Sequence, residues 1–429
     1  MAFRCGLPPA QSSSSPTLNS GMMTTTSNYD VIIAGGGPAG ASAAIHLATR
    51  GARVLLAEQK KFPRAKLCGE FISPECALHF ERLGVAEQMF AAQPARLSAT
   101  VFYSRKGKSV SVPSAWFGAD GLALGLSRAE MDERLLRRAS EAGACILEDA
   151  HVVGLVGDER RVVGVRVRAS GAEKEYQAPL TLDATGRARA LARRVGPQRN
   201  GSRPLRAPLV AFKAHLEDAA VADGKCEIYF YRGGYGGLSS IEKGLSNLCF
   251  IASARDVRAC GADAERVMRE VVCQNYRAAQ VLSNARSCSP WLAVSLEGFG
   301  RHSVAPVEGL LAIGDAASFI DPFTGSGMLM ALESGELAAN IVANHLPANR
   351  TLPNLRQLNA AYETGYHDKF DSRLKACALI RRAAFVPGMA ALAIRFFGAS
   401  NRLRRRVSRA TRGSTDETYS LEKRVDNRG

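Results

Sequence analysis

The stretch YDVIIAGGGPAGASAAIHLATRGARVLLAE, residues 29–58, decides the fold. Its apolar run over 29–34 predicts a short buried strand, which is followed by a glycine-rich turn, a helix to about residue 50 and a second strand over 53–57. This order of elements opens a βαβ unit, which leads to a parallel sheet. The sequence therefore predicts an α/β fold with a Rossmann-type nucleotide-binding domain.

The turn carries the spacing Gly35-x-Gly37-x-x-Gly40, and Glu58 stands at the end of the second strand. In such a unit the first glycine makes the tight turn, the second lets the backbone approach a pyrophosphate and the third allows close packing of helix on strand. The acidic residue accepts hydrogen bonds from a ribose, and the helix N-terminus favours the phosphates. The predicted cofactor contacts of this unit are Gly35, Gly37, Pro38, Ala39, Gly40, Glu58 and Gln59.

A second block, LAIGDAASFIDPFTGSGM at residues 311–328, distinguishes FAD from NAD. It reads as a strand, an acidic turn and a glycine-rich helix start, which an NAD-binding domain does not need. Asp315 is suited to bind ribitol hydroxyls, while backbone amides over 325–328 favour the negative charge of a reduced flavin. The predicted contacts here are Gly314, Asp315, Pro322, Gly325, Ser326, Gly327 and Met328.

This second block resembles the second FAD motif of the para-hydroxybenzoate hydroxylase superfold. Asp183-Ala184-Thr185-Gly186 resembles the middle motif of that superfold, which is usually written Asp-Gly, so Gly186 is a predicted contact. Arg128 matches an arginine that contacts FAD in many members, although a solvated arginine in the first turn of a helix is an alternative reading. The resemblance covers residues 29 to about 345 and implies an FAD-dependent oxidoreductase.

Within the superfold, PRAKLCGE at residues 63–70 resembles the geranylgeranyl reductase branch, where a Lys-x-Cys-Gly stretch follows the ribose-binding acid. The resemblance makes Cys68 a candidate for substrate contact or proton handling, with a plain core cysteine as the alternative. Tyr235 is the second candidate, because residues 233–236 resemble the Tyr-x-Trp-x-Phe-Pro substrate motif of that branch. Gly237, Ser239 and Ser240 replace its Trp, Phe and Pro, which predicts a different pocket.

These resemblances imply reduction or dehydrogenation of carbon–carbon bonds in an apolar organic molecule, with an FAD-dependent monooxygenase as the alternative. Flavin-dependent halogenases carry a Trp-x-Trp-x-Ile-Pro motif, whereas this chain has only Trp116 and Trp291, so a halogenase is a less favoured alternative. No second G-x-G-x-x-G occurs, so the electron donor stays open among NAD(P)H, ferredoxin and a quinol. A basic lipid- or nucleic-acid-binding protein with a vestigial flavin fold is the non-enzyme alternative, and the intact FAD motifs argue against it.

The order of motifs predicts an FAD-binding domain that is split in sequence. Ser127 followed by Glu130 predicts a capping box and a helix to about residue 142. Strand-like runs with glycine-rich turns over 209–253 predict a mainly antiparallel β-sheet substrate domain. The predicted parts are a disordered leader (1–28), the FAD-binding domain (29–190, with a substrate-side insertion at about 70–125, and 301–345), the substrate domain (191–300), and C-terminal helices with a basic tail (346–429).

The composition, 46% hydrophobic and 22% charged, is that of an ordinary globular protein. No stretch approaches the roughly 18 consecutive apolar residues that span a bilayer. The ten cysteines are scattered and include no C-x-x-C pair, which is typical of core cysteines in a reducing cytosol, so we expect a cytoplasmic protein. The leader holds ten Ser/Thr, one Arg and no acidic residue; a transit peptide, a disordered leader and a start at Met22 or Met23 are the alternatives.

The formal charge of +16 is concentrated toward the end of the chain, where residues 401–429 hold nine Lys/Arg against four Asp/Glu. Met389, Leu392, Ala393, Phe396 and Phe397 share one helix face, just before the basic run 402–406. Such a basic amphipathic helix either packs on its own domain or contacts an anionic membrane peripherally. We expect no nucleic acid partner.

Overall fold

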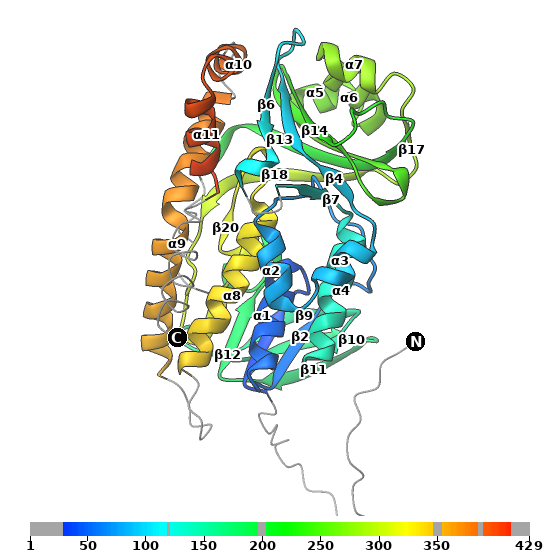
Figure 1. Ribbon diagram of the computed structural model, residues 1–429. Helices are drawn as coiled ribbons and strands as arrows, with labels where there is room; N and C mark the ends of the chain where they lie inside the picture. Colours follow the sequence, from blue (N-terminus) through cyan, green and yellow to red (C-terminus); the bar gives the residue numbers. More distant parts are fainter. Residues whose placement is uncertain (1–28, 118–120, 196–202, 346–353, 385–388, 413–429) are drawn as a thin grey trace, which may run out of the picture.

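A five-stranded parallel sheet organises the first domain of the computed structural model, which describes residues 29–117, 121–195, 203–345, 354–384 and 389–412 (Figure 1). In spatial order its strands are β19 (Leu310–Ala312), β12 (Leu180–Asp183), β1 (Val31–Ala34), β2 (Val54–Ala57) and β8 (Cys145–Leu147). The sheet joins segments from three distant parts of the chain, so the domain is split in sequence as predicted.

Both faces of this sheet are covered, and the sequence of β1 shows why. Val31 and Ile33 pack into the core beneath the helices, whereas Ile32 and Ala34 pack into a separate core on the opposite face. The helices are α1 (Pro38–Thr49), α4 (Arg128–Glu141) and α8 (Gly327–His345), and the opposite layer is an antiparallel sheet of β9 (Ala150–Gly157), β10 (Val162–Ala169) and β11 (Ala172–Gln177). Burial on both faces explains the uninterrupted apolar runs of the parallel strands.

The predicted helix start at Ser127 is confirmed, but only half of the capping box is formed. Ser127 Oγ accepts a hydrogen bond of 3.2 Å from the Glu130 amide. The Ser127 amide donates instead to Glu242 Oε2 at 2.9 Å, because Glu130 is engaged with Arg134. The first turn of α4 is thereby tied to the second domain.

The second domain is built on a nine-stranded sheet that is mainly antiparallel, as predicted. Its strands in spatial order are β20 (Ser318–Phe319), β18 (Leu292–Arg301), β13 (Arg203–Glu217), β16 (Ser246–Ser253), β15 (Gly234–Ser240), β14 (Lys225–Tyr231), β5 (Ala99–Tyr103) and β6 (Ser109–Pro113), and β17 (Arg286–Ser287) pairs with β13. The pair β14–β5 is parallel. Strands β5 and β6 come from the insertion near residues 70–125.

Three short helices that the sequence analysis did not predict cover the outer face of this sheet: α5 (Ala254–Ala259), α6 (Ala264–Glu270) and α7 (Tyr276–Val281). On β13, Phe212 and Ala214 pack toward them, while Leu209 and Ala211 face the opposite way. The inner face therefore looks toward the first domain. The connection between domains contains a small sheet, β3 (Phe71–Ile72), β7 (Ala123–Gly125) and β4 (Ala95–Leu97), and helices α2 (Cys76–Leu83) and α3 (Ala86–Ala91).

Three helices complete the C-terminal part. The long helix α9 (Leu355–Ala384) packs along α8, and α10 (Met389–Ala399) and α11 (Asn401–Ala410) pack against β6 at one edge of the molecule (Figure 1). Within the described ranges, none of the helices is long and apolar enough to cross a bilayer. The predicted leader and the end of the basic tail lie outside the described residues.

Candidate functional site

A cavity of about 1010 Å³ lies where the carboxyl ends of the parallel strands face the inner surface of the nine-stranded sheet, with α10 and α11 forming another wall. Its first-domain edge is the point where the strand order reverses on either side of β1, the usual ligand position in such sheets. Of the predicted site residues, Gly35, Gly37, Pro38, Ala39, Glu58, Gln59, Cys68, Arg128, Gly186, Tyr235, Gly314, Asp315, Pro322, Gly325, Gly327 and Met328 line the cavity. Gly40 and Ser326 lie outside its wall.

The glycines of the first turn serve two purposes. Gly35 has a φ of +109°, and a Cβ on Gly40 would lie 1.9 Å from the Gly35 carbonyl oxygen, so both positions are needed to bring α1 onto β1. Gly37 is different, because the nearest atom to a Cβ there is Arg128 Nη2 at 3.7 Å. Gly37 therefore leaves space beside the backbone at a helix N-terminus, which fits a pyrophosphate.

Glu58 is buried and its carboxylate is oriented by its own loop. Oε2 accepts a hydrogen bond of 2.8 Å from the Gly36 amide, and Oε1 accepts one of 3.1 Å from the Lys60 amide. Arg64 Nη2 lies 3.5 Å from Oε2. Because a carboxylate offers about four acceptor positions, Glu58 retains capacity for ribose hydroxyls in the cavity that it lines.

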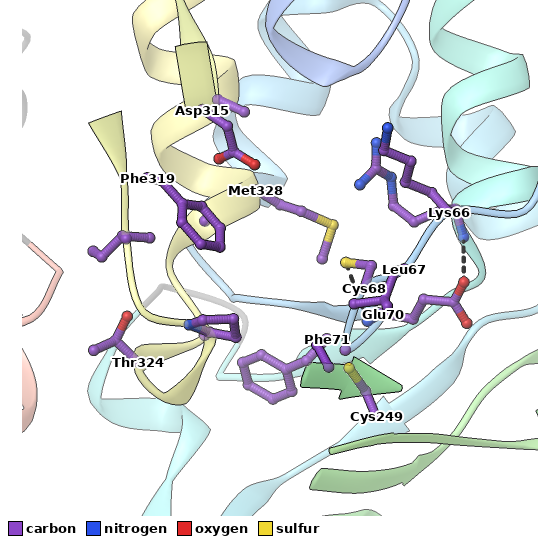
Figure 2. Close-up of a pocket in the computed structure, with 18 of the residues that line it drawn as sticks. Lys66, Leu67, Cys68, Glu70, Phe71, Cys249, Asp315, Phe319, Thr324 and Met328 are labelled. Carbon is purple, nitrogen blue, oxygen red and sulfur yellow. Dashed lines mark hydrogen bonds between the residues drawn. The ribbon is translucent and has the colours of Figure 1, made fainter. Parts of the chain in front are cut away.

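Asp315 projects into the cavity from the turn after β19 (Figure 2). Gly314, at φ +59°, packs so closely on the first turn of α1 that an added Cβ would lie 2.8 Å from Ala39 Cβ. Burial raises the pKa of Asp315, and the positive charges of Arg187, Arg128 and Lys66 oppose that rise. The site thus gathers cationic groups around one buried acid, an arrangement suited to a ligand that is both anionic and rich in hydroxyls.

The predicted loop beside the flavin, residues 321–327, is held by Tyr235. The Tyr235 hydroxyl donates to Asp321 Oδ1 at 2.5 Å, and Arg381 Nε lies 2.9 Å from Asp321 Oδ2. Burial, reinforced by Asp321, raises the pKa of Tyr235 far above its ordinary value, so the hydroxyl stays protonated and bound to the loop. Although Tyr235 lines the cavity, its geometry is that of a positioning residue.

Ser326 holds the same loop from the other side. Its hydroxyl contacts Thr324 Oγ1 at 2.9 Å and donates to the Thr411 carbonyl at 3.2 Å. Its side chain therefore joins the loop to the end of α11 and does not face the cavity. A role for Ser326 toward a cofactor would have to come from its backbone.

Arg128 is buried rather than solvated, which removes the alternative reading of this residue. Its Nε and Nη2 each donate to a carboxylate oxygen of Asp132 at 2.7 Å. Arg64 Nη1 donates to the same carboxylate at 3.1 Å. The pair of arginines lies directly beside Gly37, as their Nη2 atoms show, where phosphate oxygens would need positive charge.

Cys68 lies in the cavity wall opposite the loop of residues 321–327, close to Met328 (Figure 2). Its Sγ accepts a hydrogen bond of 3.4 Å from the Glu70 amide. Burial raises the pKa of the thiol, and the Arg128 charge only opposes this rise. Cys68 is therefore held as a neutral thiol, which can donate a proton, and not as a nucleophilic thiolate.

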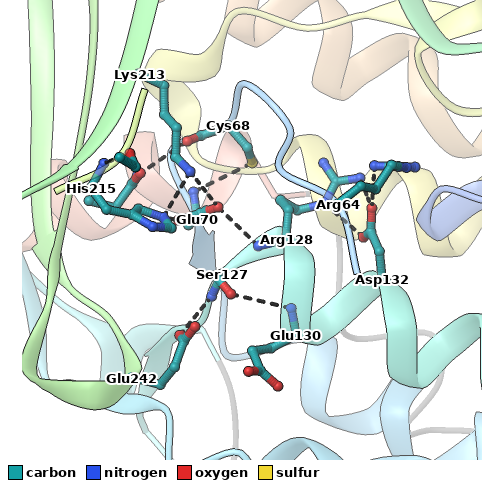
Figure 3. A network of polar contacts seen from close by, with 12 residues as sticks. Arg64, Cys68, Glu70, Ser127, Arg128, Glu130, Asp132, Lys213, His215 and Glu242 are labelled. Carbon is teal, nitrogen blue, oxygen red and sulfur yellow. Dashed lines mark hydrogen bonds and ion pairs between the residues drawn. The ribbon is translucent and has the colours of Figure 1, made fainter. Parts of the chain in front are cut away.

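Beside Cys68 lies a buried cluster that the sequence analysis missed: Glu70, Lys213 and His215 (Figure 3). Lys213 Nζ lies 3.1 Å from Glu70 Oε1 and 2.8 Å from His215 Nε2. His215 Nε2 lies 2.7 Å from Glu70 Oε2, and the Arg128 amide donates to Glu70 Oε1 at 3.0 Å. Burial raises the pKa of Glu70, but the hydrogen bond of His215 and the charges of Lys213 and His215 outweigh it and lower the pKa.

The three contacts cannot all be satisfied by one simple arrangement of protons. A ring nitrogen carries either a proton or a lone pair. If His215 Nε2 donates to Glu70, it cannot accept from Lys213; if it accepts from Lys213, it cannot donate to Glu70. The position of the proton on His215 therefore decides which of these two contacts is a hydrogen bond. The His215 side chain is 18% exposed, which connects the cluster to solvent.

A signal for this cluster was present in the sequence. Lys213 and His215 continue the alternate positions of Leu209 and Ala211 on a predicted strand, so they fall on its inward face. Two polar residues at inward positions require a buried partner. Which partner this is depends on the packing of β13 against the Cys68 loop, which no local pattern reveals.

The wall away from the predicted FAD contacts is apolar, with Phe102, Val110, Ile228, Phe230, Leu296 and Ile394 among its residues. The single apolar face predicted for the C-terminal helix is divided: Phe397 lines this cavity, whereas Leu392 and Phe396 are exposed. The reason is that one flank of α10 packs against the cavity and β6, while the other flank is exposed. The Met389 side chain lies outside the described residues.

The FAD binding domain family matches residues 28–351. Digeranylgeranylglycerophospholipid reductase 2 of Methanopyrus kandleri is 27% identical over 364 residues, covering 81% of this chain and 85% of that protein. Menaquinone reductase of Mycobacterium tuberculosis is 27% identical over 324 residues, covering 73% and 76%.

Solved structures share the fold across both domains. A geranylgeranyl bacteriochlorophyll reductase-like protein from Thermoplasma acidophilum has a TM-score of 0.69 at 19% identity, covering 85% of this chain and 89% of its own. A flavin-dependent brominase has a TM-score of 0.74 at 19% identity, covering 94% and 100%. Since one fold carries such different chemistries, it does not select between them.

Proposed function

This chain belongs to the FAD binding domain family and is an FAD-dependent oxidoreductase of the para-hydroxybenzoate hydroxylase superfold, and from this premise we propose that it reduces carbon–carbon double bonds in an apolar, isoprenoid-like molecule. The observation that carries the proposal is the apolar cavity with Cys68 and Glu70 on its wall, opposite the FAD-binding loop of residues 321–327. An apolar chain would lie between the two.

The residues present fit FAD. The space beside Gly37, with Arg64 and Arg128 next to it, suits the pyrophosphate. Glu58 suits the ribose, and Asp315 suits the ribitol chain. The amides over 325–328 suit the edge of the flavin ring. When bound, FAD supplies the two-electron redox chemistry, and the protein contributes position, exclusion of water and protons.

The substrate class is supported by the relatives and by the composition of the wall. The relatives are named as reductases of a digeranylgeranylglycerophospholipid and of menaquinone. Where the geranylgeranyl reductase branch has bulky Trp and Phe, this chain has Gly237 and Ser239, and both line the cavity. The smaller side chains leave a wider channel, which supports a substrate that differs from that of the branch.

Adding hydrogen across one double bond requires two electrons and two protons. We assign the electrons to a reductant such as NAD(P)H, passed on through FAD. The neutral Cys68 thiol and the neighbouring cluster of Glu70, Lys213 and His215 are placed to hold and replace a proton on the substrate side. This differs from monooxygenation, where an apolar substrate receives an oxygen atom.

The test uses purified holoprotein, reduced without air and mixed with a menaquinone that carries an isoprenoid side chain. We expect the oxidised flavin spectrum to return and the lipid to keep a gain of two hydrogens in mass after its quinone ring has been reoxidised in air, since oxygen reverses reduction of the ring but not of a side-chain double bond. A product that gains an oxygen atom, and forms only in air, would identify a monooxygenase and refute the reductase proposal.

The role of the buried cluster has its own test, the variant Glu70→Gln. We expect product formation to slow at least tenfold at neutral pH while FAD content stays unchanged, because the amide cannot pass on a proton. Glu333→Gln is the matched control: Glu333 is also buried and paired, with Arg373 Nη1 at 2.5 Å, but lies outside the cavity wall. Equal rates in both variants would reject the cluster as proton source.

A further inference from the structure

The C-terminal helices expose apolar side chains that the rest of the protein does not cover. Among the described residues, Leu379 is 68% exposed and Phe396 61% exposed. Leu392 and Leu403 are exposed as well. These four residues lie on three consecutive helices that pack on one another, α9, α10 and α11. They account for most of the large apolar side chains that are exposed within the described part of the chain.

The same helices are strongly basic. Residues 372–412 hold eleven Lys/Arg and no Asp or Glu. Arg373, Arg381 and Arg412 turn inward to the carboxylates of Glu333, Asp321 and Glu75. The exposed cations are Lys375, Arg382, Arg395, Arg402, Arg405, Arg406 and Arg409. The outward surface therefore combines exposed Leu and Phe with seven exposed positive charges on the same three helices, and we call it the C-terminal face.

The opposite sides of these helices form part of the cavity wall. Ile380 of α9, Ile394 and Phe397 of α10, and Val407 of α11 all line the cavity. The helices are thus apolar toward the cavity and carry apolar side chains outward as well. A stable surface helix needs only the first of these, so the outward Leu and Phe call for a partner.

We propose that the C-terminal face docks on the surface of an anionic lipid bilayer, with Leu379, Leu392, Phe396 and Leu403 in the interfacial layer and the arginines on lipid phosphates. Exposed apolar residues flanked by cations are the features of a helix that lies in a membrane interface. Docking would also place the cavity wall formed by α10 and α11 next to the bilayer. The docking itself does not depend on the proposed reductase activity.

Two other occupants fit less well. A second copy of the chain would bring two faces of the same charge together in a symmetric contact, which repels. A nucleic acid would attract the arginines, but phosphate contacts leave the exposed leucines unused. A bilayer with acidic head groups satisfies both the charges and the apolar side chains.

The test is co-sedimentation of the full-length holoprotein with vesicles of phosphatidylcholine, with or without phosphatidylglycerol. We expect binding to the anionic vesicles, with apparent affinity at least tenfold weaker for neutral ones. Leu392→Gln/Phe396→Gln should weaken binding at least tenfold, and Arg402→Gln/Arg405→Gln/Arg406→Gln should remove the preference for anionic vesicles. FAD content and thermal midpoint are measured for each variant to establish that it is folded.

Matched controls come from other parts of the surface. Phe90, on α3, is 46% exposed, so Phe90→Gln tests an unrelated exposed aromatic. Arg105, Lys106 and Lys108 are three exposed cations in the turn between β5 and β6, so their triple Gln variant removes the same charge. Both controls should bind vesicles like the wild type. An equal loss of binding in the triple Gln variant would mean that net charge alone drives the binding. An equal loss in Phe90→Gln would mean that an exposed aromatic elsewhere serves as well, and either result would overturn the proposal.

Two further results would also overturn it. Duplex DNA that binds with the same loss in the arginine variant, without effect of Leu392→Gln/Phe396→Gln, would identify a nucleic acid surface. Self-association in analytical ultracentrifugation that Leu392→Gln/Phe396→Gln abolishes, without any binding to vesicles, would identify a contact between copies.

Discussion

Gly37 and Gly40 stand three residues apart in one turn, yet each lacks a side chain for a different reason. At Gly40 a Cβ would collide with the Gly35 carbonyl at 1.9 Å, so the requirement comes from the fold. At Gly37 no atom lies closer than 3.7 Å to an added Cβ, so the fold sets no such requirement there, and we propose that a ligand does. The spacing of glycines alone does not separate these two roles, whereas the surroundings of each position do.

This difference leads to a prediction for two variants. Gly37→Val should lower the FAD content of the purified protein at least tenfold while changing the free energy of unfolding of the apoprotein by less than about 2 kcal/mol. Gly40→Ala should destabilise the apoprotein by about 4 kcal/mol or more, because the backbone must move. FAD release on denaturation and urea unfolding measure the two quantities. Full FAD retention in Gly37→Val would refute the assignment of this turn.

At the scale of elements, α8 is held to α2 by a buried carboxylate. Glu336 on α8 lies 3.2 Å from His79 Nδ1 and 3.3 Å from Arg82 Nη1, both on α2. Burial raises the pKa of Glu336, but contact with His79 and the charges of His79 and Arg82 outweigh it and lower the pKa to about 2. These contacts of Glu336 fix α8, whose N-terminus follows the loop of residues 321–327.

The pH dependence of this link can be predicted. Because the folded-state pKa lies below the ordinary 4.5, the ionised Glu336 stabilises the fold above pH 4.5, and this contribution is lost as the pH falls toward 2. Glu336→Gln should therefore lower the free energy of unfolding by about 3 kcal/mol at neutral pH. The difference from the wild type should shrink in urea titrations at successively lower pH. A constant difference would contradict this account.

At the scale of the whole molecule, the last described residues of the chain contact the loop of residues 321–327. Arg412 Nη1 lies 3.4 Å from the Gly325 carbonyl and 3.7 Å from Glu75 Oε2. The Thr411 carbonyl accepts the hydrogen bond from Ser326. The C-terminal helices therefore close the cavity and also support the loop of residues 321–327, a role that their basic composition alone does not suggest.

Truncation tests this closure. A chain that ends at Ala399 lacks α11 and the contacts of Thr411 and Arg412, and it should release FAD several times faster on dilution, as measured by the recovery of FAD fluorescence. A chain that ends at Arg412 is the control, since it keeps all of these contacts, and it should release FAD at the rate of the full-length protein. The same rate for both truncated chains would show that α11 does not support the site.

The fold could be predicted, and most of the predicted FAD contacts line one cavity, because both rest on local patterns. The predicted strands, the helix start at Ser127 and the two FAD motifs depend on neighbouring residues and on fixed spacings. Helices α5 to α7 were missed because they are short, and their burial against the sheet decides their structure more than their propensity does. The cluster at Glu70 was missed because Glu70 and His215 are 145 residues apart.

The sequence by itself determined that this protein is a flavoprotein, since turn glycines, strand ends and helix N-termini create a nucleotide site through backbone geometry that only nearby residues control. The tertiary structure alone decided what surrounds the substrate side of the cavity. There Tyr235 donates a hydrogen bond to Asp321, and Lys213 and His215 contact Glu70. One flank of α10 lines the cavity, and the other is exposed at the surface. These contacts join elements that are far apart in the sequence, and no local sequence pattern encodes how such elements pack on one another.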